Sequence, residues 1–182
     1  MKNVALFAFP FLALFLIACD GSDGPPGPPG RDGLDGEDGI NILGEVLEIE
    51  GDFSAANNYS LFFEFPQTIE VFESDLVLVF ILFEQTQDGN GQPVDVWRLL
   101  PQTRILDQGL LQYNFDHTFL DVNIFMESDF DLSTLPPGDT QNQIFRIAVV
   151  PADFSQSAKV DFSNLDALMG TLNIKEQDIK KF

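Results

Sequence analysis

Cysteine and histidine are almost missing from this chain, which holds Cys19 and His117 and no other residue of either kind. One thiol cannot form an internal disulfide, and so few thiol and imidazole groups cannot build a zinc site. Neither a Gly-x-Ser-x-Gly motif nor a phosphate-binding glycine loop occurs. His117 falls at an expected tight turn, which favours a surface residue over a catalytic base. The sequence therefore predicts a protein that is not an enzyme.

Positive charge is scarce as well. Nine lysines and arginines stand against 29 acidic residues, which gives a formal net charge of -20. A protein that binds nucleic acid needs a basic face for the phosphate backbone, so nucleic acid is excluded as a partner. The acidic excess fits a strongly hydrated exterior or the binding of cations.

The N-terminus has the features of a bacterial export signal. Lys2 precedes an apolar run, 4–17, which is too short for a comfortable membrane span and suits a signal-peptide core. The run ends in Leu16-Ile17-Ala18-Cys19, which resembles the lipobox of bacterial lipoproteins. That resemblance implies cleavage between Ala18 and Cys19, lipid on the Cys19 thiol, and a membrane anchor of two or more acyl chains. An ordinary secretory signal with a chance cysteine is the alternative.

The stretch 21–41 is a strict Gly-X-Y repeat of seven triplets. Its glycines occupy every third position: Gly21, Gly24, Gly27, Gly30, Gly33, Gly36 and Gly39. Three polyproline II chains can wind into a collagen triple helix with this spacing, because only glycine fits at the axis. The acids of the repeat outnumber its one cation, Arg31, and oppose assembly, so a disordered spacer is the alternative. The stalk would reach about 65 Å if extended and about 25 Å as a coil.

The rest of the chain, 42–182, is predicted to be an all-β head. Short apolar or alternating segments are separated by turn residues, which is typical of an antiparallel β-sandwich of immunoglobulin-like or jelly-roll-like type. The expected strands are 43–49, 59–65, 76–83, 94–100, 103–106, 110–115, 118–126 and 144–150. The segment 76–83 is apolar throughout, so we expect it to be a central strand covered on both faces.

The C-terminal end of the head carries one predicted helix. Ser163 is the expected cap of a short helix over 164–169, with Asp166 in its first turn and Gly170 as its stop. The polar segment 175–182 is expected to fray.

Two places in the head are candidate binding sites. Glu127, Asp129 and Asp131 gather three carboxylates after a strand, and calcium prefers several loop oxygens of this kind, although a solvated acidic loop is the simpler interpretation. Trp97 is the single tryptophan, and it could stack on a sugar or a partner protein if exposed, or belong to the core. No other cofactor is expected.

Three sequence segments of the head add a resemblance to a known family. The segments Asp95-Val96-Trp97-Arg98-Leu99-Leu100-Pro101-Gln102, Gln112-Tyr113-Asn114-Phe115-Asp116 and Gln143-Ile144-Phe145-Arg146-Ile147, with the lipobox and triplets, are similar to collagen-like lipoproteins of Bacteroidetes-type bacteria. The resemblance implies a lipid-anchored protein of the cell envelope, at the outer membrane or cell surface, and brings no site residues with it.

Three functional hypotheses follow from the sequence. The first is a structural or adhesive lipoprotein, with a homotrimer formed through stalk and head and a protein or glycan as ligand. The second is a calcium- or carbohydrate-binding envelope module on a disordered, monomeric spacer. A polymer hydrolase is a remote third, because acids are abundant but nothing selects a catalytic pair of them.

Overall fold

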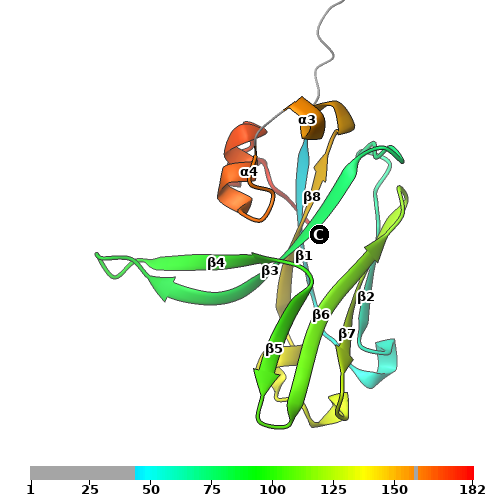
Figure 1. The fold of residues 1–182 in the computed structure, drawn as a ribbon, viewed down its shortest axis with the longest axis vertical. Helices are drawn as coiled ribbons and strands as arrows, with labels where there is room; N and C mark the ends of the chain where they lie inside the picture. The colour runs from blue at the N-terminus through cyan, green and yellow to red at the C-terminus, as the bar shows by residue number, and fades with distance from the viewer. Residues whose placement is uncertain (1–43, 158–159) are drawn as a thin grey trace, which may run out of the picture. The chain divides into compact units, whose positions relative to one another are not determined.

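The head is built mainly of β-strands arranged in two sheets (Figure 1). The computed structural model describes residues 44–157 and 160–182. Sheet A has the strand order β4-β3-β8-β1-β9 and sheet B the order β2-β7-β6-β5. The strands are β1 (Glu45–Gly51), β2 (Ser60–Glu64), β3 (Leu76–Gln87), β4 (Pro93–Leu99), β5 (Gln102–Leu106), β6 (Gly109–His117), β7 (Asp121–Ser128), β8 (Gln143–Val150) and β9 (Lys180–Lys181). The prediction of an all-β fold is confirmed.

Short helices connect or cover the strands. The α-helices of the described residues are α2 (Pro137–Thr140), α3 (Ala152–Ser157) and α4 (Leu165–Thr171), and the 3-10 turns are η2 (Ala55–Asn57), η3 (Leu132–Thr134) and η4 (Glu176–Asp178). The sequence predicted α4 alone. The cap was assigned one residue early, because Asn164, not Ser163, accepts from the Ala167 amide at 3.0 Å. Gly170 lies inside α4 rather than ending it.

The inner faces of both sheets meet in one apolar core. Phe145 and Ile147 of β8 are fully buried there, as are Val122 and Ile124 of β7. The Phe53 ring contacts both sheets in this core, since it packs edge-on against Tyr113 of sheet B and Phe145 of sheet A, with centroids 6.1 and 5.9 Å apart. The alternation of apolar residues along β6 and β7 places their inward side chains in this core, whereas β8 is apolar on both faces.

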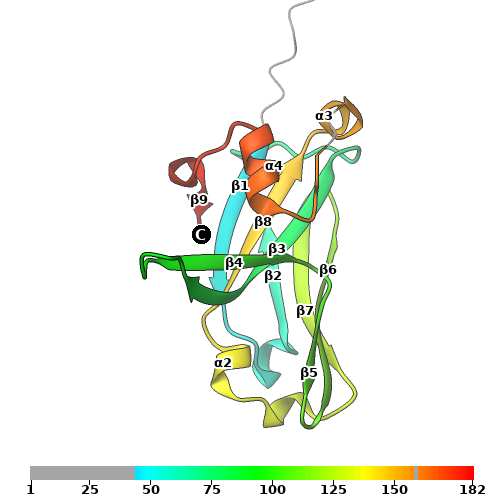
Figure 2. The ribbon, with the colours of Figure 1, turned by 60° about the vertical axis from the view of Figure 1, so that its left-hand side comes forward.

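A second core covers the outer face of sheet A. Leu78 and Phe80 of β3 point into it, whereas Val77, Val79 and Ile81 point into the first core. The prediction that 76–83 is covered on both faces is therefore confirmed. The lid over the second core is α4, which supplies Leu165, Leu168 and Met169 (Figure 2).

The turns that join neighbouring strands follow their sequence signals. Asp88 accepts backbone bonds from Asn90 and Gln92, both at 2.8 Å, and closes the β3–β4 hairpin. Gly91 takes φ +78 there, a conformation that suits glycine. The expected strand 118–126 begins later in the structure than predicted: β7 starts at Asp121, and Leu120, which precedes it, is 57% exposed.

The C-terminal segment does not fray, contrary to the sequence prediction. Ile179 is buried in the second core, and β9 pairs with β1 in parallel, so the sheet is not purely antiparallel. The Phe182 amide donates to the Glu48 carbonyl at 2.9 Å, and the Phe182 ring packs edge-on against Phe63 of β2. The chain end thus contacts both sheets at their β1–β2 side.

We expect Ile179→Ala to destabilise the head by about 2–5 kcal/mol, because the change removes buried methyl groups and leaves a cavity. Urea unfolding of residues 20–182 measures the effect. The matched control is Ile105→Ala, at a side chain that is 85% exposed, with an expected change within about 0.5 kcal/mol. Equal losses for the two variants would show that the tail is not docked.

Candidate functional site

The most polar buried position of the second core is Arg146 on β8. Its side chain is 4% exposed and lies on the same outer face of sheet A as Ala148 and Val150. The Cζ atom stands 4.1 Å from the ring centroid of Trp97, within cation–π range. A buried guanidinium must find acceptors for its N–H groups, and two carboxylates provide them.

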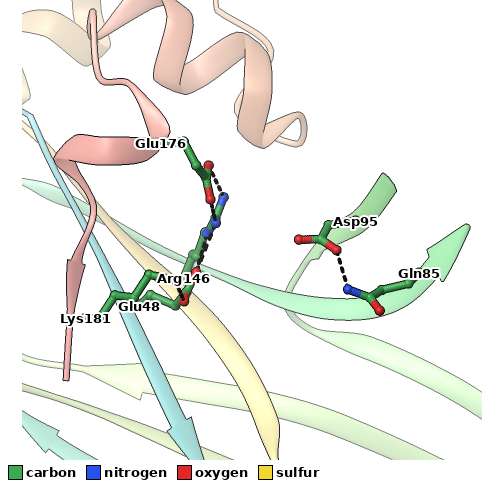
Figure 3. Close-up of polar contacts among 6 residues, drawn as sticks. All are labelled: Glu48, Gln85, Asp95, Arg146, Glu176 and Lys181. Carbon is green, nitrogen blue, oxygen red and sulfur yellow. Dashed lines mark hydrogen bonds and ion pairs between the residues drawn. The ribbon is translucent and has the colours of Figure 1, made fainter. Parts of the chain in front are cut away.

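Glu48 and Glu176 hold Arg146 from two elements (Figure 3). Arg146 Nε donates to Glu48 Oε2 at 3.0 Å across the β1–β8 pair. Its Nη1 atom donates to Glu176 Oε2 at 3.1 Å, and Nη2 donates to Glu176 Oε1, which completes a two-pronged pair with η4. Such fork-to-fork geometry fixes position as well as charge.

Lys181 adds a second cation to Glu48, with Nζ at 2.6 Å from Oε1. Burial alone would raise the pKa of Glu48, but the hydrogen bonds and charges of Lys181 and Arg146 outweigh it, so the pKa is lowered. Two cations thus meet two carboxylates in this ion-pair cluster of Glu48, Arg146, Glu176 and Lys181. These four side chains, here called the clasp, join the C-terminal tail to β1 and β8 by ion pairs.

Beside the clasp lies a groove of about 360 Å³ between β4 and the start of α4. It is lined by Asp95, Val96, Trp97, Asp161, Ser163, Asn164, Leu165 and Asp166. Trp97 is half-buried. It is therefore neither a fully buried core residue nor a fully exposed one, the two alternatives that the sequence left open. The Arg146 guanidinium packs over the indole ring of Trp97, and Trp97 also lines the groove.

The polar groups of this groove are oriented by their neighbours. Asp95 Oδ1 accepts from Gln85 Nε2 at 2.8 Å, between the two strands of the β3–β4 hairpin (Figure 3). Hydrogen bonds from the Ser163 hydroxyl and amide lower the pKa of Asp161 and keep it ionised. An indole with carboxylate, amide and hydroxyl groups beside it suits a ligand that offers both an apolar face and several hydroxyl donors.

The predicted calcium residues each have a local hydrogen-bond role. Glu127 Oε2 accepts from Asn114 Nδ2 at 3.2 Å, and Asp129 Oδ1 accepts from the Leu110 amide at 2.8 Å. Asp131 caps η3, and the Ser133 amide lowers its pKa. Within the described residues no three His, Cys, Asp or Glu side chains form a group that could hold a metal. Calcium binding at this loop stays a prediction.

Two buried polar clusters of the structure were not predicted from the sequence. Arg146 interrupts an otherwise apolar strand, and that lone charge was the signal of a buried ion pair. Tyr113 and Asp139 form a second polar cluster, where the Tyr113 hydroxyl donates to the Asp139 carbonyl at 2.7 Å and Arg104 pairs with the Asp139 carboxylate. Burial, followed by the charge of Asp139, raises the pKa of Tyr113 to about 12, so its hydroxyl stays a donor that anchors α2.

The lipobox residues Ala18 and Cys19 and the seven triplet glycines lie outside the described residues. Where the structure does describe the chain, none of its helices is both long and apolar enough to cross a membrane. Comparison with protein-family models, curated proteins and solved structures finds no match.

We expect Glu48→Gln to lower stability at neutral pH and to have less effect in acid. A carboxyl group whose pKa is lowered by folding stabilises the fold above its unfolded pKa, and that contribution disappears as the pH falls below about 4. Urea unfolding of parent and variant between pH 3 and 7 measures the gap. Glu50→Gln, the same change at an exposed position of β1, is the control and should leave the gap near zero. A pH-independent gap would contradict the role of Glu48.

Proposed function

We propose that this protein is a lipid-anchored cell-envelope protein that displays an all-β head on a collagen-like spacer, with a structural or adhesive role. The observation that carries the proposal is the direct succession of Leu16-Ile17-Ala18-Cys19 and seven Gly-X-Y triplets. A lipid anchor followed by a spacer holds whatever comes next away from a bilayer. The outer membrane or the cell surface is the proposed location.

A rigid head is what such a display function requires. The inner faces of both sheets share one core, which supports a β-sandwich as the finer description of the fold. The clasp and the docked tail hold the outer layer of sheet A in place. We propose a binding role for this head rather than a catalytic one.

Carbohydrate is the second candidate, favoured by one observation. The groove beside Trp97 combines an indole with the polar side chains of Asp95, Asn164 and Asp166. Sugars present both an apolar ring face and hydroxyl groups, and such a site satisfies both. Neutral glycans fit better than acidic ones, because the described lining of the groove is anionic.

Lipid attachment is tested by Cys19→Ser. In cells grown with labelled palmitate, we expect label in the parent chain and complete loss of label in the variant, because the variant lacks the thiol that accepts the lipid. Mass spectrometry should find a modified Cys19 at the N-terminus of the parent. The neighbouring change Ser22→Ala should keep the label, and an unlabelled parent would remove the anchor.

Glycan binding is tested by Trp97→Leu. Calorimetric titration of neutral oligosaccharides into the parent should give a binding heat, with affinity about ten-fold lower in the variant because ring stacking is lost. Phe62→Leu, at an aromatic residue of β2 that is 68% exposed, is the control and should bind as the parent does. Equal affinity in parent and Trp97→Leu would exclude this groove as the sugar site.

A further inference from the structure

One end of the head, here called the apical end, is where the described chain begins. Glu45 at the start of β1 pairs with Val149, which also pairs with Val77 near the start of β3. The loop before β3 and the loop after β6 therefore lie at the same end as the first residues of β1 (Figure 1). Residues 42–44 alone separate the last triplet from β1.

Three large apolar side chains are exposed at this end: Phe72, Phe119 and Leu120, with exposed fractions of 56%, 43% and 57%. We call them the apical patch. Phe72 and Phe119 line a hollow of about 350 Å³, together with Val71 and Val77. A group of exposed aromatic and aliphatic side chains around a hollow is typical of a contact surface.

The loops that carry the apical patch are fixed by hydrogen bonds. The Phe72 amide donates to Asp75 Oδ2 at 3.0 Å, and Asp75 Oδ1 accepts from the Ala152 amide at 3.3 Å. On the other loop, the Leu120 amide donates to Thr118 Oγ1 at 3.0 Å, and the Leu120 carbonyl accepts from Phe65 at 2.8 Å. Because these hydrogen bonds hold both loops in place, the apical patch is a preformed surface, and a partner would not have to order it on binding.

The length of chain between the triplets and β1 indicates which molecule would cover the apical patch. Three residues span at most about 10 Å, so three chains wound together up to Asn41 must bring their heads together at the apical end. A contact between heads would have to form on this end, where the apical patch lies. Because the stalk makes the encounter intramolecular, at an effective concentration near millimolar, a small contact suffices.

We infer that the apical patch is the surface through which copies of this chain contact one another and set the register of their stalks. The inference rests on the collagen-like spacer proposed above. Glu73 and Asp75 stand beside the patch, so the contact must form by apolar burial against like-charge repulsion. Salt screens that repulsion, and the association therefore strengthens as ionic strength rises.

Thiol cross-linking of the full lipoprotein in its membrane tests this contact. The native chain gives the background, since Cys19 is its one cysteine and is acylated under the proposal. Ser74→Cys places an exposed thiol between Glu73 and Asp75, and Ser133→Cys places one on η3, at the opposite end of the head. Asn41→Cys reports the stalk itself. A short bismaleimide is the probe.

The expected result is cross-linking at Asn41→Cys and Ser74→Cys, with about ten-fold less at Ser133→Cys. Adding Phe72→Ser and Phe119→Ser to Ser74→Cys should reduce its cross-linking about ten-fold, and added salt should increase it in the unaltered patch. If the Asn41→Cys variant cross-links and the Ser74→Cys variant does not, the contact between heads is overturned and the collagen-like spacer stands. No cross-linking at Asn41→Cys overturns the trimeric stalk, and the inferred contact with it.

Discussion

The buried guanidinium of Arg146 determines how the outer layer of sheet A is built. A cation that is 4% exposed inside an apolar cluster is tolerated only with carboxylates on its N–H groups. Glu48 comes from the neighbouring strand, whereas Glu176 comes from the last eight residues of the chain, so pairing the charge brings the C-terminal segment back onto β1. Ile179 then enters the second core, and β9 covers the free edge of β1. Docking of the tail is therefore an electrostatic requirement as well as an apolar one.

Much of this fold is encoded locally, and the clasp is not. The alternation in β6 and β7 and the uninterrupted apolar run of β3 predict strands, because side-chain period and burial go together. The tail looks polar in sequence, because Ile179 and Phe182 are its two apolar residues among charged and amide side chains. Its long-range pairing with β1 and the burial of Ile179 fix it in the fold. Trp97 was identified from residue type alone, but its packing against Arg146, which lies two strands away in sheet A, depends on the long-range strand order.

Both edge strands of sheet A are poorly suited to pairing with a strand of another chain. Sheet A ends at β9, which has two residues and both of them lysines, and at β4, which begins with Pro93. Short, charged or proline-bearing edge strands are poor templates for pairing with another chain. The large acidic excess acts in the same direction at longer range, since copies of net charge -20 repel each other. Both features disfavour association between copies of the head through the edges of sheet A.

Under the proposed function, the acidic excess and the poorly pairing edge strands make the stalk and the head depend on each other for association. The triplets carry a net negative charge, so three of them gain nothing electrostatically from lying side by side. The apical patch has three large side chains, too few to hold separate heads together in solution. Once lipid anchors crowd the chains on one membrane and the triplets begin to wind, the heads meet at high effective concentration, and the small patch becomes sufficient. Under the proposed function, the register of the collagen-like spacer is then set by the head, because the described residues of the head supply a preformed surface close to the last triplet.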